Sequence, residues 1–131
     1  MEAAVQETKA FIRRAGFARR MYRTNIRSLK SVRFGEIGAT RVLMKQLVGK
    51  EDGAEKTALH EIRIQKGGRT SVHSHNWQHQ IFVTSGRGIL VVGGKETALN
   101  PGDVLVVARG EEHGFEQRGR TPFVFLTVTP L

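Results

Sequence analysis

The sequence predicts an all-β domain built as an antiparallel sandwich or barrel. Three observations carry this prediction. Many short β-type runs follow one another at close spacing, the 131 residues include fifteen glycines but only three prolines, and no alternation of strands with helices indicates a parallel sheet. A chain of this length fits one domain with a real core, so we expect a single domain with a single site.

The N-terminal part of the chain is strongly basic. Residues 1–33 hold nine Lys and Arg against two Glu, so +7 of the formal net charge of +9 lies there. We expect a basic extension at 1–22, before a barrel domain at 23–131. Ala, Glu, Lys and Arg dominate residues 2–20, which favours a short basic helix, either solvated or packed. The alternatives are an arm that touches nucleic acid or lipid through its charge, and a start-site artefact with the domain beginning near Met21.

After this extension the pattern changes to short β-type runs bounded by glycine-containing turns. The run Thr40–Val48 is followed by the polar turn GKEDGAEK. Thr57–Lys66 then alternates with period two, which places His60, Ile62 and Ile64 on one face of a strand. Both segments are therefore predicted to be strands.

The second half of the chain continues in the same way, with most runs closed by glycine or proline. Gly67-Gly68 is expected to form a turn, Gly93-Gly94 a tight hairpin, and Pro101-Gly102-Asp103 a further turn. No helix is expected after residue 21. The predicted strands are Thr70–His75, His79–Thr84, Ile89–Val92, Lys95–Leu99, Val104–Val107, His113–Gln117 and Phe123–Thr129.

Four of the five histidines lie in two glycine-bracketed phrases, and we expect them to meet around one metal ion. Residues i and i+2 of a strand point to the same side, so His73 and His75 should project together. His79 follows at a spacing that allows the chain to bend and re-enter on that side, and His113 would come from a facing strand. Imidazole is the commonest nitrogen ligand of first-row divalent metals. The absence of cysteine excludes disulfides and thiolate sites.

These phrases resemble the two motifs of the cupin superfamily. The first motif, G-x5-H-x-H-x(3,4)-E-x6-G, is matched by Gly67, His73, His75, position 79 and Gly86. The second motif, G-x5-P-x-G-x2-H-x3-N, is matched by Gly102, Gly110 and His113. The chain departs from these motifs at three positions, with His79 in place of the glutamate, Ala108 in place of the proline and Gln117 in place of the asparagine.

The segment HSHNWQHQIFVTSG is similar in sequence to the first motif of the small manganese-containing monocupins of thermophiles, whose metal is held by four histidines. This resemblance implies a small antiparallel jelly-roll barrel and a homodimer. It also implies a metal with two adjacent open coordination positions. The implied ligands are His73, His75, His79 and His113.

An imidazole in place of a carboxylate leaves the metal its full +2 charge, which makes it a stronger Lewis acid and stabilises its higher oxidation state less. We expect Mn²⁺ or Fe²⁺, although Cu²⁺, Ni²⁺ and Zn²⁺ bind imidazole more tightly and can take the site. An apolar pocket wall is expected around the metal. Its candidate residues are Trp77, Phe125, Thr127 and His60, with simple packing as the alternative for Trp77. No carboxylate is evident among them, which disfavours two-acid hydrolysis.

These features favour a metal-dependent oxidoreductase, dioxygenase-like or peroxide-using, that acts on a small and fairly apolar molecule. The alternatives are a metal-dependent isomerase or lyase of a sugar or keto acid, and a non-enzymatic module that binds a metal or a small ligand. Nucleic acid is disfavoured as a partner except through the basic arm, because no DNA-binding motif is recognisable. No apolar run approaches the length of a membrane span, so a cytoplasmic protein is expected.

Overall fold

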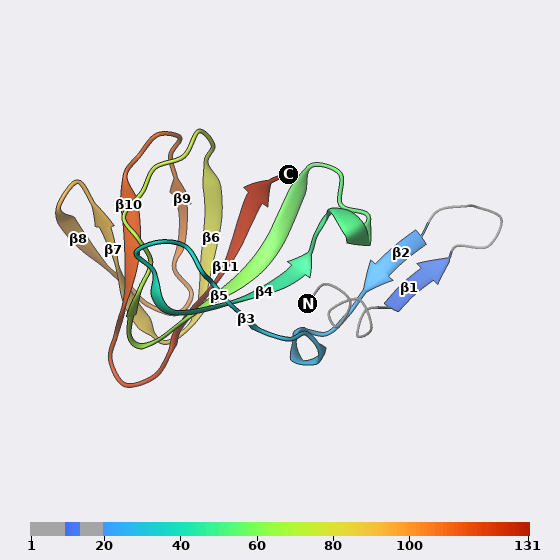
Figure 1. Ribbon diagram of the computed structural model, residues 1–131, viewed down its shortest axis with the longest axis horizontal. Helices are drawn as coiled ribbons and strands as arrows, with labels where there is room; N and C mark the ends of the chain where they lie inside the picture. Colours follow the sequence, from blue (N-terminus) through green and yellow to red (C-terminus); the bar gives the residue numbers. More distant parts are fainter. Residues whose placement is uncertain (1–9, 14–19) are drawn as a thin grey trace.

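The computed structural model describes residues 10–13 and 20–131. Within these residues, nine strands join into one antiparallel sheet that curls on itself (Figure 1). The strands are β3 (Val32–Arg33), β4 (Thr40–Val48), β5 (Thr57–Arg69), β6 (His79–Ser85), β7 (Arg87–Val92), β8 (Lys95–Leu99), β9 (Val104–Val107), β10 (His113–Arg118) and β11 (Phe123–Pro130). The predicted all-β class is confirmed.

The strand order runs β8-β7-β10-β5-β11-β6-β9, and β4 pairs with β5 while β3 pairs with β4. The long strand β5 therefore contacts β4, β11 and, at its end, β10. Because β11 lies between β5 and β6, it connects the part of the sheet that holds β8, β7, β10 and β5 to the part that holds β6 and β9. This arrangement brings the starts of β6 and β10 to the same end of the curled sheet.

The predicted turn at Gly67-Gly68 is wrong, because β5 continues through it to Arg69. Gly67 has a φ of 79°, and a Cβ at Gly68 would lie 2.7 Å from the carbonyl oxygen of Thr40, so the two glycines let β5 bend closely around β4. The strand predicted at Thr70–His75 is also wrong. That segment touches β10 as an isolated bridge between His73 and His113 and otherwise runs as a loop.

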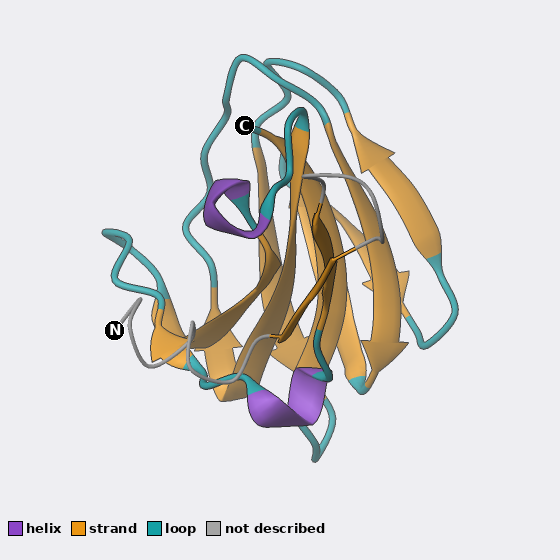
Figure 2. Ribbon diagram, turned by 90° about the vertical axis from the view of Figure 1, so that its right-hand side faces the viewer, coloured by secondary structure: helices purple, strands orange, loops and turns teal. Residues whose placement is uncertain are grey.

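Two single turns of 3₁₀ helix interrupt the β structure, although no helix is expected after residue 21 (Figure 2). They are η1 (Ile26–Ser28), which is capped by the Asn25 side chain, and η2 (Lys50–Asp52), in which Asp52 accepts from the Gly49 N–H. Turns this short show no periodicity in a sequence. No helix in the described part of the chain is long and apolar enough to cross a membrane.

At the N-terminus, β1 (Ala10–Arg13) pairs antiparallel with β2 (Arg20–Arg23). The helix predicted over residues 2–20 is therefore wrong where the structure describes that segment, and the rest of it lies outside the described residues. Phe11 stands opposite Tyr22 in the register, and aromatic residues favour strand pairing over an isolated helix. The boundary between the extension and the barrel stays a prediction.

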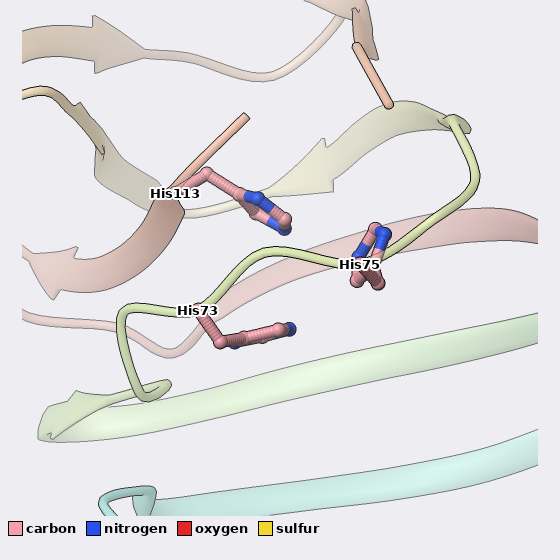
Figure 3. Close-up of side chains that lie close together, drawn as sticks. All are labelled: His73, His75 and His113. Carbon is pink, nitrogen blue, oxygen red and sulfur yellow. The ribbon is translucent and has the colours of Figure 1, made fainter. Parts of the chain in front are cut away.

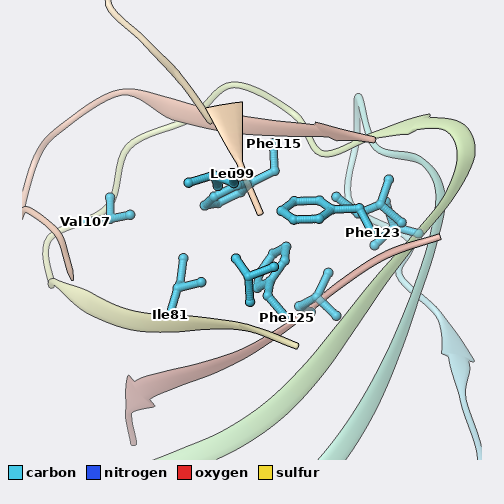
Figure 4. Close-up of a cluster of buried hydrophobic side chains, with 10 residues drawn as sticks. Ile81, Leu99, Val107, Phe115, Phe123 and Phe125 are labelled. Atoms are coloured by element: carbon cyan, nitrogen blue, oxygen red, sulfur yellow. The ribbon is translucent and has the colours of Figure 1, made fainter. Parts of the chain in front are cut away.

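The main core fills the inside of the curled sheet (Figure 4). The Phe115 and Phe125 rings lie with centroids 4.8 Å apart, and those of Phe123 and Phe125 lie 5.4 Å apart. Along β11 the inward positions alternate, so Phe125 and Thr127 face the same interior. The core therefore forms the floor of the cavity in which the histidines lie.

Candidate metal centre

The structure brings the four predicted histidines together from three segments. His73 and His75 lie on the loop after β5, His79 opens β6, and His113 opens β10. One ring nitrogen each of His73, His75 and His113 lie within 4.8 Å of one another, and the three rings point toward a common centre (Figure 3). The Nε2 of His79 lies 3.2 Å from the Nε2 of His113.

Backbone carbonyls fix three of the four rings. The Nδ1 contacts are His73 to Ser71 O at 3.0 Å, His75 to Trp77 O at 2.9 Å and His113 to Glu111 O at 2.8 Å. A carbonyl oxygen only accepts, so each Nδ1 carries the proton and donates it. Each Nε2 therefore keeps its lone pair, as in metal-ligating histidines whose other nitrogen is held by a hydrogen bond.

His79 is held by a side chain from a distant strand. Its Nδ1 lies 2.9 Å from the Oγ1 of Thr127 on β11. When this ring also donates from Nδ1, the Nε2 lone pairs of His79 and His113 face each other at 3.2 Å. Two such lone pairs repel unless a cation lies between them. The donor set therefore fits a divalent transition metal, which prefers neutral imidazole nitrogen.

Burial keeps two of these rings neutral. It lowers the pKa of His79 to about 4, and the neighbouring His113, His75 and His73 act in the same direction. Burial also lowers the pKa of His113, although the Glu111 carbonyl opposes this shift. Because the metal-binding form of histidine is the neutral one, protons compete weakly for this centre at neutral pH.

This pKa shift predicts a pH-dependent stability of the metal-free protein. In the unfolded chain His79 takes up a proton near its ordinary pKa of 6.5, whereas in the folded chain it does so only near 4. The contribution of His79 to the free energy of unfolding is therefore fully present above pH 6.5. It is lost as the pH falls from 6.5 to 4, and this loss amounts to at most about 3 kcal/mol. Urea unfolding at several pH values should show a smaller slope over this window in His79→Gln. Equal slopes in both proteins would contradict the prediction.

The four histidines line a cavity of about 510 Å³. The predicted pocket residues His60, Trp77, Phe125 and Thr127 all line it. The remaining wall is mostly apolar and includes Phe34, Val42, Met44, Ile62 and Phe115. Trp77 stacks on His75 with ring centroids 4.1 Å apart and an interplanar angle of 8°. It thus packs directly against one of the candidate ligands.

No carboxylate is evident among the predicted pocket residues, but the structure adds one, because Glu36 lines the cavity. Its Oε1 accepts a hydrogen bond from Ser71 Oγ at 3.0 Å and lies 3.6 Å from the Nδ1 of His73. A carboxylate beside a ligating histidine strengthens that ring as a ligand. Glu36 lies in the loop between β3 and β4 and belongs to no motif, so no sequence pattern indicates that it reaches the histidines.

The fold and the site define a small curled β-barrel protein with a candidate histidine metal centre. Residues 60–129 match the family model described as a cupin domain. The chain is 30% identical over 93 residues to an oxalate-binding protein of Thermotoga maritima, covering 70% of this chain and 77% of that protein. The chain belongs to the cupin family.

Two further relatives are connected with polyketides. The chain is 30% identical to the tetracenomycin polyketide synthase protein TcmJ of Streptomyces glaucescens, over 72% of this chain and 62% of that protein. The structure of the polyketide cyclase RemF from Streptomyces resistomycificus superposes with a TM-score of 0.81 and 32% identity, covering 84% of this chain and 79% of that one. The structure of a predicted oxalate decarboxylase from Thermotoga maritima superposes with a TM-score of 0.67 and 26% identity. The match covers 79% of this chain and 91% of that one.

Proposed function

We propose that this cupin is a metal-dependent enzyme that cyclises a polyketide-type substrate, an uncharged molecule with neighbouring carbonyl or phenol oxygens. The observation that carries the proposal is a cavity whose wall combines four histidines with mostly apolar and aromatic side chains. Its volume of about 510 Å³ falls in the usual range of small-molecule sites. The likeness to TcmJ and RemF supports this substrate class.

In this proposal His73, His75, His79 and His113 hold a divalent metal, with Mn²⁺ or Fe²⁺ as the first candidates and Zn²⁺, Cu²⁺ and Ni²⁺ as alternatives. The metal would act as a Lewis acid that polarises two neighbouring oxygens of the substrate. Four neutral ligands leave it the full +2 charge, which favours polarisation of carbonyls over oxidation. Glu36 would hold the Ser71 hydroxyl beside His73, and the apolar wall would exclude water from the reacting carbonyls.

The oxalate-binding relative suggests a different ligand, but the cavity wall disfavours it. Among the described residues, no Lys or Arg lines the cavity, and Glu36 adds a negative charge. An oxalate dianion would therefore meet like charge and apolar surface beyond the metal. An uncharged polyketone would instead bury its carbon skeleton against Phe34, Met44 and Phe125.

A metal-dependent oxidoreductase, dioxygenase-like or peroxide-using, is the second candidate. The feature that favours it is the same apolar wall, which suits an uncharged substrate and dioxygen. This function requires a redox-active metal and a co-oxidant. Oxygen consumption with a bound substrate would support it, whereas turnover that is equally fast without oxygen would support cyclisation.

The first test of the proposed function is binding of 2′-hydroxyacetophenone, an aromatic ketone whose phenol and carbonyl oxygens form a chelating pair. Metal-loaded protein is expected to shift the absorbance of this probe to longer wavelength, because a polarised phenol loses its proton. Metal-free protein serves as the control and should leave the spectrum unchanged. No shift with loaded protein would contradict the polyketide proposal, and tight binding of oxalate by the same protein would then favour the oxalate ligand.

We also propose that the protein is a homodimer, joined through an apolar groove on the outside of the sheet. Val104 and Val106 on the β9 edge are 74% and 57% exposed. They line a groove with Phe82 and Val128 in which, among the described residues, no side chain is charged, so two copies of this face meet without like-charge repulsion. The unpaired edge of β9 favours the same contact.

Val104→Lys is therefore expected to weaken the dimer at least about tenfold, because it buries a charge in the apolar contact. Sedimentation velocity over a concentration series measures the effect. The control is Ile37→Lys, since Ile37 is 94% exposed and lies outside the groove. A wild-type protein that stays monomeric at high concentration would refute the interface.

A further inference from the structure

We infer that His60, the fifth histidine, is the catalytic residue that transfers the proton in this cavity. It would take a proton from the carbon next to a polarised carbonyl of the substrate. This role rests on the proposed function and adds to it the residue that makes the carbon nucleophile. It explains why a fifth histidine lines the cavity outside the four-histidine cluster.

The strand register places His60 next to the metal centre without making it a ligand. On β5 it stands opposite Thr127 of β11, and Thr127 Oγ1 lies 2.9 Å from the Nδ1 of His79. Side chains of directly opposite residues start about 4.5–5.5 Å apart on the same face of a sheet. His60 is thus the cross-strand neighbour of Thr127, the residue whose hydroxyl group contacts the His79 ring. A substrate that chelates the metal and extends along the wall would bring its next carbon atoms to this ring.

The hydrogen bonding of His60 differs from that of the other four histidines. Each of those has its Nδ1 bonded to an oxygen. In the described part of the chain, no side chain or carbonyl forms a hydrogen bond with the His60 ring, which leaves both nitrogens available to a ligand.

The surroundings of His60 keep it in the form that accepts a proton. Burial lowers its pKa, and the negative charge of Glu51 opposes this shift only in part. Its cross-strand neighbours, Gln46 on β4 and Thr127 on β11, are uncharged. The ring is therefore neutral at pH 7 and can act as a general base.

The other polar residues of the wall are less suited to this role. Glu36 is held by Ser71 and lies beside His73, where it supports the cluster. Thr129 has no basic atom. Among the described lining residues outside the four-histidine cluster, Glu36 and His60 are the two bases, and His60 is the one whose side chain has no hydrogen bond to another described residue.

The step balances without a further reagent. The C–H bond next to the carbonyl breaks, its proton goes to a nitrogen of His60, and its electron pair forms the C=C bond of an enolate with the charge on oxygen. The enolate carbon then attacks a second carbonyl carbon of the same substrate. The new alkoxide takes the proton back from His60, which restores the neutral ring.

The test uses 2′-hydroxyacetophenone again, now in deuterium oxide with metal-loaded protein. Its methyl protons lie next to the carbonyl, and NMR follows their replacement by deuterium. We expect His60→Gln to slow this exchange at least about 100-fold while the absorbance shift stays within twofold, since general bases contribute about 10²–10⁴-fold. Added imidazole should restore part of the exchange in His60→Ala, which a purely structural role would not allow. Arg63→Gln, a change outside the cavity wall on the same strand, is the control.

The outcomes separate the two proposals. No absorbance shift with wild-type protein overturns the proposed function and, with it, the role of His60. A normal shift with no exchange in the wild type, or with undiminished exchange in His60→Gln, overturns only the role of His60. Loss of metal from His60→Gln would also overturn it, because His60 would then support the cluster.

Discussion

Replacing His113 with alanine is expected to remove the metal from an otherwise folded protein. His113 is the most buried of the four rings, at 1% exposure, and has contacts with all three others. Its loss deletes the candidate ligand whose ring contacts those of both His73 and His79. Loss of a residue that merely supports a ligand costs about 10–100-fold in metal affinity, so loss of this ligand should cost at least about 100-fold.

Elemental analysis of protein from metal-balanced medium, followed by titration with a chelator, measures this loss. Glu112→Gln is the control, because Glu112 precedes His113 but is exposed and outside the cavity. Circular dichroism establishes that both variants keep the β fold. A folded His113→Ala protein with full metal occupancy would refute the four-histidine centre.

The largest effect on stability is expected from Gly86→Ala. Gly86 joins β6 to β7 with a φ of 72°, and a Cβ at this position would overlap the carbonyl oxygen of Pro122. The alanine would have to move the backbone that leads into β11. We expect a loss of at least about 3 kcal/mol, the sum of left-handed strain and a clash that cannot relax cheaply.

Gly93→Ala separates these two contributions. Gly93 also has a positive φ, of 55°, but a Cβ there meets nothing within 4 Å. Its substitution should cost only about 1–2 kcal/mol, from backbone strain alone. Urea unfolding of both variants measures the difference. Equal losses would show that the contact with Pro122 does not determine the need for glycine at position 86.

Most strands are predictable from the sequence because turns with glycine or proline bound them on both sides. Lys95–Leu99 and Val104–Val107 match β8 and β9 to the residue. The prediction fails around Gly67, where a left-handed glycine inside a strand has the same local pattern as a turn. Only the pairing of β5 with distant β4 and β10 decides between the two, and this pairing is not a local property of the sequence.

In the candidate site, too, some features follow from the local sequence and others depend on how distant strands pair. The sequence predicts that the histidines converge, and His79 and His113 do open strands. His73 and His75 converge for another reason than the predicted one, because they lie on the loop after β5 and not on a strand. The hydrogen bonds that orient the histidine rings could not be predicted. Trp77 and Glu111 accept them through their backbone carbonyl oxygens, and every residue type has such an oxygen. Thr127 is predicted as a pocket residue, but its contact with His79 depends on the register of β11.

The position of β11 has a consequence for the order of events during synthesis. This strand is the latest of the sheet in chain order, yet it lies between β5 and β6. As the ribosome releases the chain, β6 and β9 have no direct pairing to the rest of the sheet until β11 arrives. The candidate metal centre combines His79 from one side with His113 from the other, so its four histidines can come together only after the barrel has closed. A nascent chain that lacks β11 should bind metal poorly and should depend on chaperones that cover the open edges of β5 and β6.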